Sequence, residues 1–515
     1  MSHGLEPSAG IGVVGVGTMG SGIAQIAALA GHQVIMVDAV AGRADEAVGR
    51  LRAQLAALVA KGRLDAATAE ATGDRLGSGD DLGALAPAAL VIEAAAETLD
   101  VKTALFTALE AIVDEDCILA TNTSSLSVSA IAAALRRRQR LVGMHFFNPA
   151  PVMRLVEVVS GLDTDPAVAE RVAATARAWG KSPIHVASTP GFVVNRVARP
   201  FYGEALRAVE ERAADPATID AVIRECGGFR MGPLELTDLI GQDINHAANR
   251  SVWEAFGHDP RYTPSLAQRA LVDAGRLGRK SGRGFYCYDG AERPAPATAD
   301  PTPAPAEVSV QGEWRVWSPL WDRIAAGGVT VHRTPATERA AGSAAGPALA
   351  RTAGITLVPT TGRTATELAR ELGGPVAVID LVREAATSPR WAIAVDDGCP
   401  PAARAAAVGL LQAGGAAVSV VADVPGLVLA RTVAMLVNEA ADVAGRGVAR
   451  AMDVDRAMEW GANYPQGPLT WGDEVGAAWV VALLDTLGAY HGDGRYRPCP
   501  TMRRAALGAR SLRDL

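Results

Sequence analysis

The 515-residue sequence lacks the segments that membrane and secreted proteins need. No uninterrupted apolar run approaches the ~18 residues of a membrane-spanning helix. The first residues, MSHGLEPSAG, lack the charged and apolar regions of a signal peptide. Its five cysteines lie far apart without a CxxC pair, which argues against a disulfide framework and a zinc cluster. We therefore expect a soluble cytoplasmic protein.

An excess of positive charge and a metal-binding histidine pattern are also missing. The formal net charge of -7 gives no general attraction for nucleic acid or for an anionic membrane surface. The eight histidines show neither HxH nor HExxH spacing, so we expect no metal site. An anionic ligand would have to be held by a local binding site.

The first part of the chain has the pattern of an α/β domain. From Gly10 to Ser188, short Val/Ile/Leu-rich runs alternate with helical stretches, which is typical of a parallel sheet with crossover helices. We predict a Rossmann-type, doubly wound domain over residues 1–188. Its expected strands are 11–15, 33–37, 90–94, 117–121, 141–147 and 155–159.

The chain is too long for one hydrophobic core, and its pattern changes after Pro190. Apolar residues at helical spacing predict an all-α domain over residues 189–290. Residues 291–307 are rich in proline and alanine and are interpreted as an extended linker that does not pack. Residues 308–422 are predicted to form a small, degenerate α/β region without a phosphate-binding loop. The expected helical segments are 192–211, 216–226 and 233–254, and the further strands are 355–359, 376–381, 392–395 and 417–421.

The all-α domain recurs at a constant offset of 235 residues. Matched pairs are Pro190–Val193 with Pro425–Val428, Glu204 with Glu439, Asp220 with Asp455, Gly232–Leu234 with Gly467–Leu469, and Asp238 with Asp473. The repeat predicts a second all-α domain over residues 423–515. Asn195 becomes Ala430 in this copy, and Gly278–Tyr286 has no counterpart before the last residue. The second copy is therefore expected to keep its packing and to lack chemistry.

A glycine-rich loop follows the first predicted strand and precedes a helical run. Gly15 permits a tight turn, Gly17 a close approach of pyrophosphate, and Gly20 close packing of helix on strand. The helix N-terminus would then bind the pyrophosphate. Asp38 ends the second strand ~20 residues later, where a carboxylate binds the adenosine ribose hydroxyls and repels a 2′-phosphate. This pattern favours NAD over NADP.

A second group of polar residues follows later strands of the same domain. Asn122–Leu126 comes after an apolar strand and, taken alone, is typical of a helix N-cap. The next strand carries His145, with Glu157 twelve residues further on. A lone histidine in an apolar strand is usually a core residue. A sheet-edge position, a downstream acid and a nucleotide site in one domain together indicate a catalytic histidine.

These motifs, in this order over residues 10–290, resemble the 3-hydroxyacyl-CoA dehydrogenases. The resemblance rests on Gly15–Gly20, Asn122–Leu126, His145–Pro149, Pro190–Arg196 and Gly278–Tyr286. It implies oxidation of a (3S)-3-hydroxyacyl-CoA thioester to the 3-oxo form with NAD. The duplicated helical domain is similar to longer bacterial members, several of which act on 3-hydroxyadipyl-CoA in phenylacetate breakdown. 3-Hydroxybutyryl-CoA is the other expected substrate.

The resemblance also assigns roles to individual residues. His145 would be the general base and Glu157 its partner, while Ser124 and Asn195 would contact the reacting end of the substrate. Lys61 falls where the family often contacts coenzyme A, although a basic residue on a solvated helix is the simpler interpretation. The expected cofactor site comprises Gly15, Gly17, Thr18, Met19, Gly20, Asp38, Glu97, Lys102, Asn122 and Asn148.

Two other functions fit part of the pattern. A short-chain β-hydroxyacid dehydrogenase would be expected to use a lysine as its acid/base group, whereas here a histidine–glutamate pair is present. A protein that binds NAD without turnover fits the last domain, which has Ala430 in place of Asn195. In the resembling family the helical domain is the dimer surface. The chain is thus expected to form a homodimer, or to be a monomer whose two helical domains pair.

Overall fold

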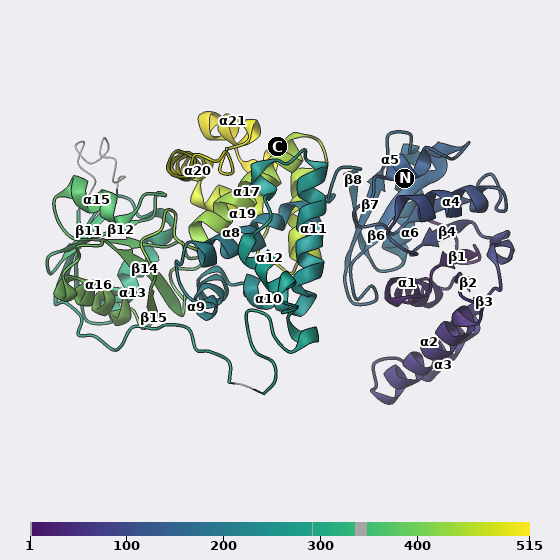
Figure 1. The fold of residues 1–515 in the computed structure, drawn as a ribbon, viewed down its shortest axis with the longest axis horizontal. Helices are drawn as coiled ribbons and strands as arrows, with labels where there is room; N and C mark the ends of the chain where they lie inside the picture. The colour runs from purple at the N-terminus through teal and green to yellow at the C-terminus, as the bar shows by residue number, and fades with distance from the viewer. Residues whose placement is uncertain (1–2, 291, 335–347) are drawn as a thin grey trace. The chain divides into compact units, whose positions relative to one another are not determined.

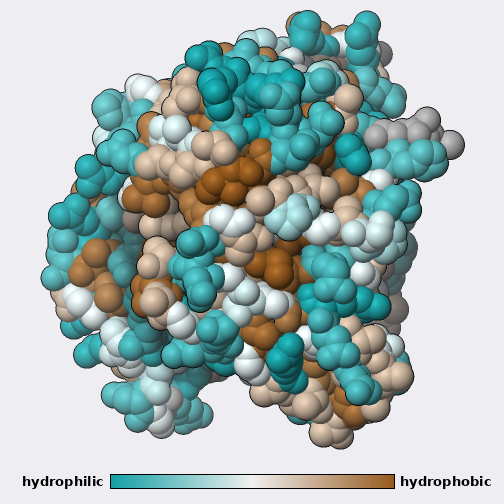
Figure 2. Space-filling model, turned by 90° about the vertical axis from the view of Figure 1, so that its right-hand side faces the viewer, coloured by the Kyte–Doolittle hydropathy of each residue, from teal (hydrophilic) through white to brown (hydrophobic). Residues whose placement is uncertain are grey.

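The computed structural model describes residues 3–290, 292–334 and 348–515 and divides into two compact units (Figure 1). The first unit contains residues 1–196 and 446–462, and the second contains residues 197–445 and 463–515. Among the described residues no helix combines the length and apolarity needed to cross a membrane. The face in Figure 2 has an apolar band between polar regions.

The first unit is built on an eight-stranded sheet with the order β3-β2-β1-β4-β5-β6-β7-β8. Its strands are β1 Ile11–Val14, β2 Val34–Val37, β3 Leu76–Ser78, β4 Leu90–Glu93, β5 Ile118–Thr121, β6 Leu141–Phe146, β7 Leu155–Ser160 and β8 Ser182–Ala187. The helices of its N-terminal part are α1 Thr18–Leu29, α2 Arg43–Ala60, α3 Ala66–Asp74, α4 Leu99–Glu110, α5 Val128–Ala132 and α6 Pro166–Ala178. The predicted Rossmann-type fold is confirmed, and strands β3 and β8 are additional to the prediction.

The sheet is parallel except where β6 pairs antiparallel with β7. The link between these strands, residues 147–154, is too short for the crossover connection that parallel strands require. Strands β1 and β4 are adjacent and fully buried, and the chain order reverses between them. In doubly wound folds this switch point is where ligands bind, at the carboxyl ends of the strands.

The second unit contains a seven-stranded sheet with the order β10-β9-β11-β12-β13-β14-β15. Its strands are β9 Glu307–Gln311, β10 Thr330–Thr334, β11 Leu349–Thr352, β12 Ile355–Pro359, β13 Val376–Ile379, β14 Arg390–Val395 and β15 Ala417–Val420, and its helices are α13 Pro319–Ala326, α15 Ala365–Leu372 and α16 Pro401–Ala413. The last four strands match the predicted ones. Strands β9, β10 and β11 were not predicted because they are partly exposed and lack an apolar run.

The proline-rich segment is extended, as predicted, but the expectation that it does not pack is wrong. The backbone N–H of Ala299 donates to the carbonyl of Val418 at 2.8 Å, along edge strand β15. The N–H of Ala297 donates to Oγ1 of Thr218 at 2.7 Å. An edge strand leaves unpaired backbone groups, and this extended segment satisfies some of them.

The helical copies have matching elements. The first contains α7 Val194–Val197, α8 Arg199–Glu210, α9 Pro216–Ala221, α10 Pro233–Ile240, α11 Gln242–Ala255 and α12 Leu266–Asp273; the second contains α17 Leu429–Gly445, α18 Ala451–Gly461, α19 Pro468–Val475, α20 Ala477–His491 and α21 Pro500–Gly508. The prediction of one helix over residues 233–254 is wrong, because Gly241 interrupts it. The φ angle there is 105°, and its counterpart Gly476 has 92°, both outside helical geometry.

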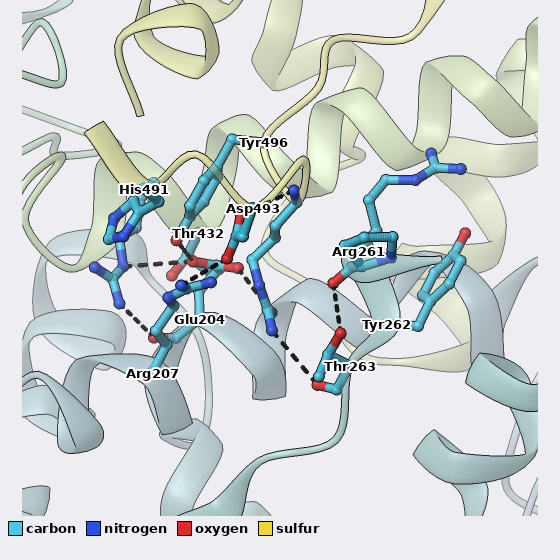
Figure 3. A network of polar contacts seen from close by, with 12 residues as sticks. Glu204, Arg207, Arg261, Tyr262, Thr263, Thr432, His491, Asp493 and Tyr496 are labelled. Carbon is cyan, nitrogen blue, oxygen red and sulfur yellow. Dashed lines mark hydrogen bonds and ion pairs between the residues drawn. The ribbon is translucent and has the colours of Figure 1, made fainter. Parts of the chain in front are cut away.

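Reciprocal contacts join the two helical copies within the second unit, where α8 packs against α17. Tyr496 of the second copy donates to Glu204 of the first at 2.8 Å (Figure 3). Tyr262 of the first copy donates to Glu439 of the second at 2.5 Å. These glutamates are equivalent in the repeat. Each glutamate is thus bound by a tyrosine of the other copy, although the two tyrosines stand one position apart at the offset of 235 residues. This pattern is similar to that of an isologous dimer interface, here inside one chain.

The repeat also extends into the sheets, beyond the helical copies identified from the sequence. At the offset of 235 residues, α16 coincides with α6, and the antiparallel step between β6 and β7 recurs between β13 and β14. Asp380 then stands at the position of His145, and Ala392 at that of Glu157. The second half keeps the backbone of the first and replaces its polar pair.

Asp380 has a structural role instead. Its buried carboxylate accepts hydrogen bonds from the backbone N–H groups of Val428, Leu429 and Ala430 at 2.8–3.0 Å, just before and at the start of α17. These are donors that a helix N-terminus leaves unsatisfied. Burial raises the pKa of Asp380 to about 6, against the effect of the hydrogen bonds, which lower it.

The titration of Asp380 predicts a pH dependence of stability. Because its pKa in the folded protein lies above the usual value near ~4, the folded state binds this proton more tightly than the unfolded chain. This contribution is complete below about pH 4 and is lost as the pH rises through about 6. The unfolding free energy of the wild type relative to Asp380→Asn should therefore fall over this range, by up to about 3 kcal/mol.

Urea unfolding of both proteins between pH 4 and 8 measures the difference. Exposed Asp397, substituted as Asp397→Asn, is the matched control and should give no such slope. A difference for Asp380→Asn that stays constant across the range would contradict the prediction.

Candidate active site

The glycine loop has the geometry that its sequence predicts. Gly15 has a φ of 89°, and a Cβ there would lie 2.6 Å from the carbonyl oxygen of Ala94. A Cβ on Gly20 would lie 1.8 Å from the carbonyl oxygen of Gly15, so only glycine lets α1 pack this closely. Gly17 has open space at the same point, which leaves room for a ligand to approach the backbone.

Asp38 lies at the end of β2, beside this loop. Its carboxylate accepts hydrogen bonds from the N–H of Val16 at 3.0 Å and of Val40 at 3.1 Å. It borders a cavity of 630 Å³ lined by Val14, Gly15, Gly17, Val37, Asp38, Ala39, Val40, Arg43, Asp80, Asp81, Leu82, Ala94, Ala95, Ala96, Val101 and Leu105. The arrangement suits a nucleoside whose ribose lies at the carboxylate.

A neighbouring cavity of 460 Å³ shares Gly17 and Arg43 with the first as lining residues. Thr18 and Arg43 line it, together with Arg50 and Gln54 of α2, which the sequence analysis missed. Residues 43, 47, 50 and 54 follow helical spacing, so they share one face of α2. Lys61 is not brought into this group: it is exposed at the C-terminal end of α2.

The predicted catalytic residues meet around a third cavity, of 360 Å³. It is lined by Met19, Ala94, Ala95, Glu97, Lys102, Asn122, Ser124, His145, Phe146, Phe147, Asn148 and Asn195. These residues come from separate segments that end at the same edge of the sheet. The fold therefore brings together most of the residues that were singled out along the sequence, and Glu157 lies directly behind His145.

His145 and Glu157 are opposite each other on antiparallel strands β6 and β7. Nδ1 of His145 lies 2.7 Å from Oε2 of Glu157, and both side chains are buried. An ionised carboxylate can only accept, so Nδ1 carries the proton and Nε2 keeps a free lone pair. The other oxygen, Oε1, accepts from the N–H groups of Val193 and Val194, each at 3.0 Å.

Lys102 is a buried cation between two carboxylates. It pairs with Glu93, which is also bound by Oγ1 of Thr121 at 2.7 Å, and its Nζ lies 3.2 Å from Oε2 of Glu97. Burial acts to raise the pKa of Glu97, but the hydrogen bond from Thr123 and the charge of Lys102 outweigh it and hold that pKa below its ordinary value. Glu97 is therefore an anion at neutral pH.

Two asparagines fix the backbone around the cavity. Oδ1 of Asn122 accepts from the N–H of Phe146 at 2.8 Å, which ties β5 to the strand that carries His145. Nδ2 of Asn195 lies 3.4 Å from the carbonyl oxygen of Ser124. The Ser124 N–H donates to Glu97 at 2.8 Å. Ser124 and Asn195, the two residues expected to contact the substrate, are thus held by hydrogen bonds to neighbours within the site.

Lys181 also supports the site, although no pattern in the sequence pointed to it. Its buried ammonium donates to the carbonyls of Ala150 at 2.6 Å and Met153 at 2.8 Å, in the loop that follows His145. Burial lowers the pKa of Lys181. Within the described ranges no group of His, Cys, Asp or Glu side chains could hold a metal ion.

Comparison with known families matches most of the chain, with the exception of residues 289–356 and the two ends. The family model described as "3-hydroxyacyl-CoA dehydrogenase, NAD binding domain" matches residues 10–189, and "3-hydroxyacyl-CoA dehydrogenase, C-terminal domain" matches residues 191–288 and 426–511. Residues 357–425 match the "3-hydroxybutyryl-CoA dehydrogenase reduced Rossmann-fold domain". The last match agrees with the extension of the repeat into the second sheet.

Individual relatives agree with these matches. The chain is 44% identical over 497 residues to the 3-hydroxyadipyl-CoA dehydrogenase of Escherichia coli (strain K12), covering 96% of this chain and 97% of that protein. The 3-hydroxybutyryl-CoA dehydrogenase of Clostridioides difficile is 39% identical over 279 residues, covering 54% of this chain and 99% of that protein. A crystal structure described as 3-hydroxybutyryl-CoA dehydrogenase from Escherichia coli K12 superimposes with a TM-score of 0.88 at 43% identity, covering 98% of this chain and 99% of that one. The chain belongs to the 3-hydroxyacyl-CoA dehydrogenase family of NAD-dependent oxidoreductases.

Proposed function

We propose that this protein interconverts (3S)-3-hydroxyacyl-CoA and 3-oxoacyl-CoA with His145 as its general base. The observation that carries the proposal is the bond between Nδ1 of His145 and the buried Glu157, which leaves Nε2 as the proton acceptor at the cavity. Nε2 takes the hydroxyl proton while hydride leaves C3 of the substrate. NAD, when bound, supplies the nicotinamide carbon that accepts this hydride and its two electrons.

The other side chains position the reacting atoms. Glu157 fixes the imidazole tautomer and stabilises the imidazolium that forms during oxidation. Ser124 and Asn195, which line the same cavity, hold the 3-oxygen and the thioester carbonyl by hydrogen bonding. Asn148 and Asn122 complete the polar border near the nicotinamide.

We assign the dinucleotide to the cavities of 630 Å³ and 360 Å³, which share Ala94 and Ala95 as lining residues. Asp38 binds the adenosine ribose, the loop and its Thr18 and Met19 hold the pyrophosphate, and Glu97 with Lys102 faces the nicotinamide ribose. Coenzyme A is assigned to the cavity lined by Arg43, Arg50 and Gln54, because the positive charges of the two arginines suit its phosphates. Lys61 lies outside this cavity, exposed at the end of α2, which favours its interpretation as a solvated residue over a contact for coenzyme A.

The proposed substrates are 3-hydroxyadipyl-CoA, as in phenylacetate breakdown, and 3-hydroxybutyryl-CoA. The first is supported by the full-length relative of that name, and the second by shorter relatives that match the first half of the chain. We further propose a cytoplasmic enzyme with domains at 1–188, 189–290, 308–422 and 423–515. The reciprocal contacts between its helical copies favour pairing within one chain over pairing of two chains through that face.

The assigned base is tested by NADH oxidation with acetoacetyl-CoA. His145→Ala should lower kcat by roughly 10²-fold or more, because proton transfer then lacks its positioned group. His185→Ala, in neighbouring strand β8, is the control and should keep the wild-type rate. A wild type that binds NADH but turns over neither this substrate nor an adipyl analogue would favour the alternative of a non-catalytic NAD-binding protein.

The preference for NAD is tested at Asp38. Asp38→Ser removes the charge that repels a 2′-phosphate and leaves Arg43, whose guanidinium lies 3.8 Å from the carboxylate, free to attract it. The ratio of kcat/KM for NADPH to that for NADH should rise at least about tenfold, or about 1.4 kcal/mol. Asp80→Ser, at the far side of the same cavity, should change the ratio much less. An unchanged ratio in Asp38→Ser would remove this carboxylate from the ribose site.

A further inference from the structure

Part of the second helical copy belongs to the NAD-binding unit. Residues 446–462, which include α18, group with residues 1–196 and not with the rest of their own copy. Helix α18 contacts strands β7 and β8. The N–H of Ala187 at the end of β8 donates to the carbonyl of Val448 at 2.8 Å. The non-catalytic copy therefore covers one edge of the catalytic sheet.

The same contact is present in the other half of the chain with the partners exchanged. The N–H of Ala422 after β15 donates to the carbonyl of Ala213 of the first helical copy, also at 2.8 Å. Both residues are equivalent to Ala187 and Val448 at the offset of 235 residues. Each helical copy thus packs on the sheet of the opposite half, and this exchange has persisted although the two halves differ in chemistry.

Gly461, the last residue of α18, brings the second helical copy close to the residues that surround Glu157, the partner of the proposed base His145. A Cβ there would lie 2.5 Å from Cδ2 of Leu155 and 3.1 Å from Cγ2 of Val194. Val194 donates its N–H to Glu157, and the next residue, Asn195, lines the catalytic cavity. Leu155 precedes Glu157 by two residues on β7, so both side chains point to the same side of the sheet.

The rest of α18 is anchored in a way that fixes Gly461. Val454, Ala457 and Met458 are fully buried, so the helix cannot shift without losing core packing. The guanidinium of Arg154 lies over the ring of Trp460 at 5.3 Å, directly before β7. Helix α18 therefore packs against the beginning of β7, the strand that carries Glu157.

We propose that α18, through Gly461, is a positioning element for catalysis: it holds Leu155 and Val194 so that Glu157 and Asn195 keep their geometry. The inference rests on the proposed function, because it takes His145 and Glu157 as the base and its orienting group. It gives the degenerate second copy a role in the reaction without any contact with substrate. A two-domain chain could obtain the same support only from a second subunit.

The experiment uses the full chain and a pair of substitutions. Gly461→Ala adds one methyl group at a position whose φ is not in the left-handed region, so the backbone tolerates alanine and only Leu155 and Val194 are displaced. The double variant Gly461→Ala with Leu155→Val removes the δ-methyl group that collides. Gly488→Ala in α20 of the same copy, where a Cβ meets nothing within 4 Å, is the matched control.

We expect kcat with acetoacetyl-CoA to fall about tenfold or more in Gly461→Ala, while NADH affinity, measured by fluorescence, changes by less than about twofold. The kcat of the double variant should recover to within about threefold of the wild-type value. The kcat of Gly488→Ala should equal the wild-type value. A wild-type kcat in Gly461→Ala overturns the inference. So does a loss that Leu155→Val does not reverse, or one that accompanies equal loss of NADH binding. Failure of the proposed function is seen separately, as full activity of His145→Ala.

Discussion

The site depends on the buried carboxylate of Glu157. A carboxylate removed from water is costly unless hydrogen bonds satisfy it, and here one oxygen binds His145 while the other binds the N–H groups of Val193 and Val194. The same group thus fixes the imidazole and holds the turn that places Asn195 at the cavity. Strand, base and the start of the helical domain are linked through one side chain.

The second half of the chain also needs a buried carboxylate to accept hydrogen bonds at a helix start, but it lacks the proposed catalytic pair. A buried helix N-terminus still requires an acceptor, and Asp380 provides it from the position equivalent to His145. With Ala392 in place of Glu157, no pair remains that could orient a base. The second half has therefore kept the residues that its packing requires and lost the polar pair of the first half. The duplicated fold persists because both halves bury each other's surfaces.

Reciprocity explains why the degenerate half is retained. Tyr262 and Tyr496 each bind the equivalent glutamate of the other helical copy, and each copy also contributes a backbone contact to the opposite sheet. Arg431 and Arg495 of the second copy also pair with Glu204, and Arg261 of the first copy pairs with Glu439. Separation of the copies would remove these partners from buried charges, which is strongly destabilising. Loss of either half would expose the other.

Local sequence patterns were sufficient for the Rossmann-type fold, the glycine loop, the His145–Glu157 pairing and the helical repeat, because turns, strand periodicity and spacing act over short distances. Tertiary structure alone decided which distant charges meet, as for Lys102 with Glu93, and which helix covers the catalytic sheet. The repeat did not reveal that α18 groups with the first sheet, or that Asp380, at the position of His145, binds the backbone at the start of α17. Those features depend on long-range packing, for which the sequence carries no local signal.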